Sequence, residues 1–128
     1  MKKARILIVE DELIVAEDLF EGLEKEGYEV VAKVSNADQA LEKCLEPRVD
    51  LVVIDIKFGG RDEGLEAAGL IRAELDIPLV YLTDHPKHPL PVQEDCLQSS
   101  PCVIEPFREE ELYAIIQAIL KESERNTE

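Results

Sequence analysis

The chain lacks a long apolar stretch, contains no tryptophan and has a single methionine. A membrane-spanning helix needs about 20 mostly apolar residues, whereas the first apolar run, which starts at Ile6, ends before Glu10. That run is also too short for the apolar centre of a secretion signal, although Lys2 and Lys3 precede it. The sequence therefore predicts a cytoplasmic protein without a membrane anchor.

Positive charge is scarce. The 128 residues include 14 lysines and arginines against 29 aspartates and glutamates, which gives a formal net charge of -15. Such a surface repels nucleic-acid phosphates and anionic lipid headgroups, so we expect no direct binding to nucleic acid or to membranes. It attracts divalent cations. Most of the carboxylates belong to the solvated surface, and only those that the fold brings together can form a site.

Cysteines are also few, and the three present form no C-x-x-C pair and have no histidine at a spacing typical of zinc sites. An odd number of cysteines without a secretion signal indicates reduced thiols. Cys44 and Cys102 have apolar neighbours, so we expect both of them in the core.

Short apolar runs rich in β-branched residues alternate with segments of helical periodicity. Five runs predict strands: residues 4–9, 28–34, 51–54, 78–83 and 102–104. Their hydrophobicity is continuous rather than alternating, which is typical of parallel strands that are covered on both faces. Four helices are indicated by the apolar sets Ile14, Leu19, Phe20 and Leu23; Ala37, Ala40, Leu41, Cys44 and Leu45; Leu65, Ala68, Ile71 and Leu75; and Leu112, Ile115, Ile116 and Ile119.

The β-α order repeats five times and predicts an α/β fold: a doubly wound, five-stranded parallel sheet between two layers of helices. Gly27 after the first helix and Asn36 before the second are typical stop and start signals. The fourth helix should be shortened or irregular, because Pro86, Pro89 and Pro91 fall where it is due. We expect one domain over residues 1–128, with an ordered core of about 4–121 and a polar tail of 122–128.

Acidic residues follow three of the predicted strands. Ligands of open α/β sheets bind at the carboxyl ends of the strands, where these residues converge. Glu10 and Asp11 follow the first strand, Asp55 the third and Glu105 the fifth, while Thr83 ends the fourth. Carboxylates packed together bind protons or recruit a cation, and hard oxygen ligands suit Mg²⁺. Beside such a cation Asp55 is a candidate nucleophile toward phosphorus, and Thr83 can donate its hydroxyl to a phosphoryl oxygen.

At these strand ends the sequence resembles the receiver domains of response regulators from two-component signalling. The matching segments are Ile6-Leu7-Ile8-Val9-Glu10-Asp11-Glu12, Asp50-Leu51-Val52-Val53-Ile54-Asp55-Ile56-Lys57, Gly64-Leu65-Glu66-Ala67, Val80-Tyr81-Leu82-Thr83 and Pro106-Phe107. The resemblance runs from about residue 4 to about residue 121 and implies the three-layer, flavodoxin-like (βα)5 fold.

The resemblance also implies roles for the strand-end residues. Asp55 would accept a phosphoryl group from a sensor histidine kinase or a phosphotransfer protein. Glu10, Asp11 and Asp55 would hold Mg²⁺ together with the backbone carbonyl of Lys57. The hydroxyl of Thr83 would turn toward the phosphoryl group and report its presence.

Several positions depart from the family pattern. Glu105 stands where relatives carry the lysine that contacts the phosphoryl group, and Cys102 stands where they carry a switch aromatic. Asp84 replaces a residue that is usually small. An anion at position 105 would be repelled by the phosphate. Two unit charges roughly 4 Å apart interact by about 4 kcal/mol at an effective dielectric constant near 20. These departures support an alternative: a degenerate receiver that binds or dimerises without phosphorylation.

A third interpretation is a phosphohydrolase or a nucleotide-binding enzyme on a similar sheet. A dehalogenase-type phosphatase needs an aspartate two residues beyond Asp55, where this chain has Lys57. A phosphate-binding turn after the first strand needs glycine, and residues 10–12 contain none. We therefore predict a signalling module rather than a turnover enzyme. The sequence leaves open a homodimer and an output domain in the same, longer chain.

Overall fold

The computed structural model describes residues 3–46, 48–55, 63–83, 102–104 and 107–126; at residues 63–65, 83, 104 and 124–126 it describes the backbone alone. The elements, in chain order, are β1 (Arg5–Val9), α1 (Leu13–Lys25), β2 (Glu29–Val34), α2 (Ala37–Cys44), β3 (Leu51–Asp55), α3 (Glu63–Glu74), β4 (Leu79–Thr83), β5 (Cys102–Ile104) and α5 (Glu109–Asn126). Each predicted strand and helix within these ranges is present. The shortened fourth helix was predicted for residues that lie outside the described ones.

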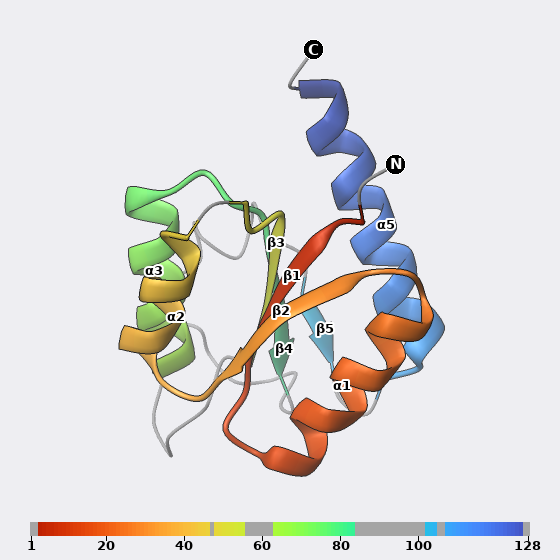
Figure 1. Ribbon diagram of the computed structural model, residues 1–128, viewed down its shortest axis with the longest axis horizontal. Coiled ribbons are helices and arrows are strands. Elements are labelled where there is room, and N and C mark those ends of the chain that lie inside the picture. The colour runs from red at the N-terminus through yellow and green to blue at the C-terminus, as the bar shows by residue number, and fades with distance from the viewer. Residues whose placement is uncertain (1–2, 47, 56–62, 84–101, 105–106, 127–128) are drawn as a thin grey trace.

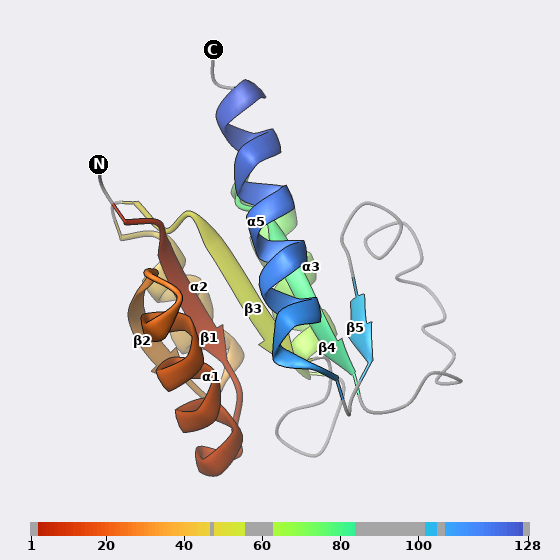
Figure 2. The same cartoon turned by 90° about the vertical axis from the view of Figure 1, so that its right-hand side faces the viewer.

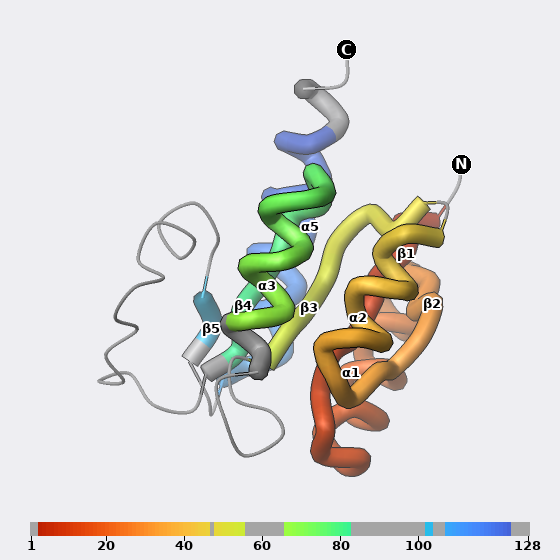
Figure 3. The backbone as a smooth tube through the Cα atoms, turned by 90° about the vertical axis from the view of Figure 1, so that its left-hand side faces the viewer, coloured from red at the N-terminus to blue at the C-terminus, as the bar shows by residue number. Residues whose placement is uncertain are grey.

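The five strands form one parallel sheet in the order β2-β1-β3-β4-β5. Helices α1 and α5 cover one face of this sheet, and α2 and α3 cover the other (Figures 1 and 3). The three-layer, doubly wound (βα)5 architecture is therefore confirmed. None of the described helices is long and apolar enough to cross a membrane.

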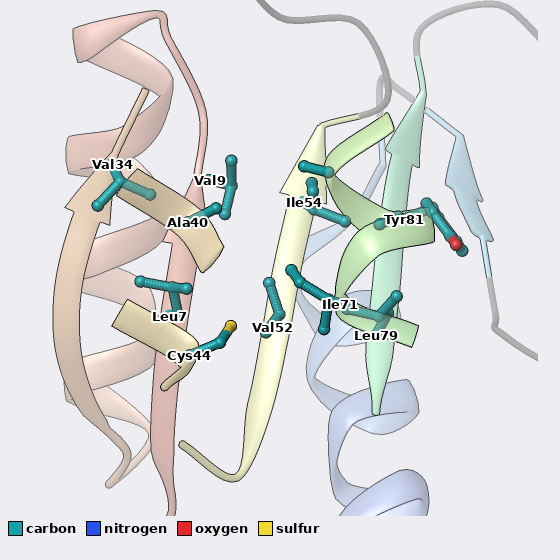
Figure 4. Packing of buried hydrophobic residues seen from close by; sticks show 12 residues of the cluster. Leu7, Val9, Val34, Ala40, Cys44, Val52, Ile54, Ile71, Leu79 and Tyr81 are labelled. Atoms are coloured by element: carbon teal, nitrogen blue, oxygen red, sulfur yellow. The ribbon is translucent and has the colours of Figure 1, made fainter. Parts of the chain in front are cut away.

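Both faces of the central strands are buried, which explains their continuous hydrophobicity. On β1, Leu7 and Val9 pack toward α2 and α3, whereas Ile6 and Ile8 pack toward α1 and α5. Successive side chains of a strand point to opposite faces, so a strand covered twice has no polar side. Figure 4 shows the first of these clusters, in which Ile71 of α3 lies against the sheet.

The amino ends of β1 and β3 are fixed by a reciprocal pair of hydrogen bonds. The backbone N–H of Arg5 donates to the Asp50 carboxylate at 2.8 Å, and the N–H of Asp50 donates to the Arg5 carbonyl at 2.8 Å. The same register continues along both strands and ends with Val9 opposite Ile54. As a consequence, the two residues that follow at this edge, Glu10 and Asp55, are neighbours.

The turn between α1 and β2 follows the stop signal in the sequence. Gly27 has φ of 95°, a left-handed conformation that carries little penalty only for glycine. The N–H of Gly27 donates to the Glu24 carbonyl and that of Tyr28 to the Leu23 carbonyl, each at 3.1 Å, which closes the helix end. At the start of α2, the Asn36 side chain accepts the N–H of Gln39 at 2.8 Å, as the sequence predicted.

Two expectations about single positions were wrong. Ile14 was assigned to the buried stripe of α1, but it is 79% exposed. It lies two residues before buried Ala16, a rotation of roughly 200° about the helix axis, and so faces away from the sheet. Cys102 was expected in the core but is exposed, because it begins the short strand at the sheet edge. Cys44 is buried as expected.

Helix α5 extends beyond the residue at which the sequence placed the end of the ordered core. The core was expected to end near residue 121, yet α5 continues to Asn126. Lysine, glutamate and arginine favour the helix at solvent-exposed positions, so a polar composition does not by itself end one.

Candidate functional site

Three carboxylates gather where β1 and β3 end. Glu10 and Asp11 follow β1, Asp55 closes β3, and one carboxylate oxygen of each lies within 4.8 Å of the others. Asp11 is exposed, Asp55 is half-buried and Glu10 is only 5% exposed. The convergence that the sequence predicted for these three residues is therefore present.

Glu10 is the one buried polar or charged side chain among the residues whose exposure is described. Its carboxylate accepts the backbone N–H of Glu12 at 3.2 Å, directly before α1 begins. Its own backbone N–H donates to the Val34 carbonyl at 2.9 Å, which ties it to the end of β2. Glu10 is thus held in place by β2 on one side and by the start of α1 on the other.

Burial and negative neighbours shift the titration of Glu10. Burial, followed by the charge of Asp55, raises its pKa from 4.5 to about 8, with smaller contributions from a hydrogen bond to Asp55 and from the charge of Asp11. The hydrogen bond from the Glu12 N–H acts in the opposite direction. Near neutral pH, Glu10 consequently retains a proton in the metal-free protein, which reduces the repulsion within the site.

The other predicted site residues are described only in part. Thr83 ends β4 and is paired with Ile104 of β5, one residue beyond the pair formed by Asp55 and Leu82. Its backbone therefore reaches the same edge of the sheet as the carboxylates. The positions of Lys57 and Glu105 lie outside the described residues.

The structure adds one feature that was not predicted from the sequence. Leu13 and Ile14 are 82% and 79% exposed, directly after the acidic residues of the site. Two consecutive residues of a helix point about 100° apart, so two large apolar residues in succession do not both face the centre of one buried stripe. The succession of Leu13 and Ile14 was therefore the signal in the sequence for an exposed apolar side chain. Such side chains beside a site offer an apolar contact to another molecule.

The matching family model decides the classification: the response regulator receiver domain model covers residues 6–117 of this chain. The chain belongs to the response regulator receiver family. This receiver domain is 34% identical over 128 residues to the transcriptional regulatory protein YvrH of Bacillus subtilis, an alignment that covers 100% of this chain and 54% of that protein. It is 40% identical over 79 residues to the transcriptional regulatory protein PdtaR of Mycobacterium tuberculosis, covering 62% of this chain and 38% of that protein.

Solved structures agree with this classification. The N-terminal domain of a three-domain response regulator, sensory box and GGDEF protein from Carboxydothermus hydrogenoformans superimposes with a TM-score of 0.85 at 28% identity, covering 97% of this chain and 99% of that one. A CheY-like receiver domain from Methanospirillum hungatei shares the fold, with a TM-score of 0.80 at 24% identity over 98% and 99% of the two chains. The flavodoxin-like fold is confirmed. The receiver domain spans about half the length of YvrH.

Proposed function

We propose that this receiver domain is a Mg²⁺-dependent phosphoacceptor, with Asp55 as the residue that accepts the phosphoryl group. The phosphodonor in this proposal is a phosphohistidine of a sensor histidine kinase or of a phosphotransfer protein. The observation that supports it most directly is the approach of the Glu10, Asp11 and Asp55 carboxylates to within 4.8 Å at the carboxyl edge of the sheet.

The donor set fits Mg²⁺. The ion prefers hard oxygen ligands and commonly binds to one or two carboxylates while it keeps several waters. In our proposal Asp11 and Asp55 bind it directly, Glu10 binds it through a water, and the backbone carbonyl of Lys57 completes the protein ligands. The raised pKa of Glu10 also supports a cation site, because burial and the neighbouring charges of Asp55 and Asp11 disfavour its ionised form. When bound, Mg²⁺ would neutralise charge on the phosphoryl oxygens.

In the transfer step, a carboxylate oxygen of Asp55 attacks phosphorus and the phosphorus–nitrogen bond to the donor histidine breaks. An acyl phosphate forms on Asp55, and the histidine leaves as neutral imidazole after taking up a proton. Asp55 is half-buried at the end of a buried strand, so its carboxylate is held while it faces the donor. The hydroxyl of Thr83 would then bond a phosphoryl oxygen, and the added charge would bias the surrounding surface.

The donor protein needs a contact surface beside Asp55. We assign Leu13 and Ile14 to this contact, since both are largely exposed and follow the acidic residues directly. We extend the proposal to an output domain in a longer chain that contains this receiver domain, because the receiver domain aligns with only 54% of its relative YvrH.

A second candidate is a receiver that works without phosphorylation. It is favoured by Glu105 in place of the family lysine and by Cys102 in place of the switch aromatic. Cys102 is an exposed residue opposite buried Tyr81 of β4, so no aromatic ring occupies that position of β5.

Chemical trapping distinguishes the two candidates. The protein is incubated with a small phosphodonor and Mg²⁺, reduced with borohydride and digested, because borohydride converts an aspartyl phosphate to homoserine. The proposal predicts homoserine at position 55 in the parent. Its absence, in a protein that still binds its partners, would favour the phosphorylation-independent module.

A further inference from the structure

Helices α1 and α5 lie on the same face of the sheet (Figure 2). Residues of these two helices line two adjoining cavities. The first has a volume of about 260 Å³ and a mostly apolar lining that includes Val15, Leu19 and Leu112. The second has a volume of about 420 Å³. Tyr113 and Glu109 line both of them, so the two cavities form one continuous surface.

The second cavity combines aromatic rings with negative charge. We call it the tyrosine pocket; its lining includes Tyr28 and Tyr113 together with Glu26, Glu109 and Glu110. None of the ion pairs within the described part of the chain involves these three glutamates. The carboxylates of Glu26 and Glu110 are therefore available to a cation from outside, whereas that of Glu109 also accepts a hydrogen bond from the Tyr113 side chain.

The position of Tyr113 depends on a residue of the neighbouring helix α1. A Cβ atom at Gly22 of α1 would overlap the Tyr113 hydroxyl, so the phenol occupies the space that the side chain of any other residue would need. Glycine at position 22 thus lets Tyr113 pack against α1 and form the wall between the two cavities.

The electrostatic environment of both tyrosines is negative. Burial and then the charge of Glu26 raise the pKa of Tyr28. Burial is the largest cause of the raised pKa of Tyr113, and the charges of Glu109 and Glu26 raise it further. The carboxylates that disfavour a phenolate here favour a cation at the same place.

We propose that the tyrosine pocket binds an arginine side chain of a basic partner protein, while a neighbouring aliphatic side chain of that partner occupies the apolar cavity. A guanidinium stacks on phenol rings and pairs with carboxylates in a planar geometry, which matches two tyrosines beside three glutamates. The adjoining apolar cavity favours a protein segment over a free amine, which would leave that cavity empty. A second copy of this chain is disfavoured, because each copy carries a net charge of -15.

Tyrosine fluorescence provides the test, because the chain has three tyrosines and no tryptophan. The probe is a short amphipathic peptide with an arginine one helical turn from a leucine, and its control carries citrulline, a neutral isostere, in place of the arginine. We expect the arginine peptide to change the fluorescence and to bind about tenfold more tightly than the citrulline peptide. Equal affinity for both peptides would overturn the proposal.

Variants assign the binding to the pocket. Glu109→Gln combined with Glu110→Gln should weaken binding of the arginine peptide, and so should Tyr113→Leu. The matched control combines Glu42→Gln with Glu74→Gln, two exposed glutamates of α2 and α3 on the opposite face of the sheet, and should bind like the parent. If free arginine amide bound as tightly as the peptide, the assignment of a protein partner would be wrong. The assay needs no phosphodonor, so its outcome is independent of Asp55 chemistry.

Discussion

The carboxylates of Glu10 and Asp55 lie close enough to bind a common cation, and Asp55 is the charged neighbour that contributes most to the raised pKa of Glu10. The two residues come from different strands, β1 and β3, whose register brings their ends together. The energy of this arrangement in the metal-free protein is unfavourable at high pH, since burial and repulsion both disfavour the charged Glu10. A cation that binds between these carboxylates relieves the repulsion.

Replacement of Glu10 by glutamine tests this electrostatic cost. A folded-state pKa of about 8 against an ordinary value of 4.5 means that Glu10 contributes stability below pH 4.5 and loses it as the pH rises through 8. In EDTA, the free energy of unfolding of Glu10→Gln should therefore equal that of the parent near pH 4 and exceed it by about 2–4 kcal/mol above pH 8. Urea unfolding across this pH range measures the difference.

Glu42→Gln, at an exposed position of α2, is the control and should differ from the parent by the same small amount at every pH. A pH-independent effect of Glu10→Gln would show that Glu10 is ionised in the folded protein, contrary to our account.

Magnesium should stabilise the protein through the three carboxylates. At a concentration 100 times the dissociation constant, we expect a gain of about 2.7 kcal/mol in the free energy of unfolding. The gain should be larger at pH 8 than at pH 5, because the Glu10 proton competes with the cation. Asp11→Asn and Asp55→Asn should each reduce it in a thermal melt. A gain that both variants retain would indicate that Mg²⁺ only screens the general negative charge.

Leu13→Ser combined with Ile14→Ser tests the contact with the phosphodonor protein. Both side chains are largely exposed, so their replacement should leave the stability within about 0.5 kcal/mol of the parent. The rate of labelling by acetyl phosphate should stay the same, whereas transfer from a phosphohistidine protein that phosphorylates the parent should slow at least severalfold. Equal slowing with both donors would place these residues in the chemistry rather than in the contact.

Gly22 and Tyr113 should be energetically coupled. An alanine in a helix is more favourable than glycine by about 1 kcal/mol, but here its Cβ would meet the Tyr113 hydroxyl. We expect Gly22→Ala to raise the free energy of unfolding little or not at all in the parent. In a Tyr113→Phe background the increase should approach the full difference between alanine and glycine. A double-mutant cycle by urea unfolding measures the coupling. Additive effects would mean that Tyr113 is not packed against Gly22.

The fold and the position of the site could be predicted because both depend on local sequence features. Continuous apolar runs indicated a sheet covered on both faces, and parallel strands bring their carboxyl ends to one edge. The sequence therefore predicted that Glu10, Asp11 and Asp55 meet at this edge, where their carboxylates lie within 4.8 Å of one another. The turn at Gly27 was equally local, since a left-handed residue at a helix end favours glycine.

Other features depend on contacts between distant segments and could not be predicted. The sequence predicted that the packed carboxylates bind protons or a cation, but it does not show that Glu10 is buried and Asp11 exposed, so it could not assign the raised pKa to Glu10. Residue 22 and residue 113 meet only after α1 and α5 pack on the same face of the sheet. The exposure of Ile14 follows from the rotation of α1, which an apolar pattern alone did not fix.

The central claim, phosphorylation at Asp55, is tested most directly by intact-mass measurement after incubation with acetyl phosphate and Mg²⁺. Phosphorylation of Asp55 should give a single phosphoryl increment in the parent, no increment in Asp55→Asn and none in the parent when EDTA replaces Mg²⁺. An equal increment in Asp55→Asn would place the acceptor elsewhere. No increment in the parent with acetyl phosphate, carbamoyl phosphate or phosphoramidate would contradict the account.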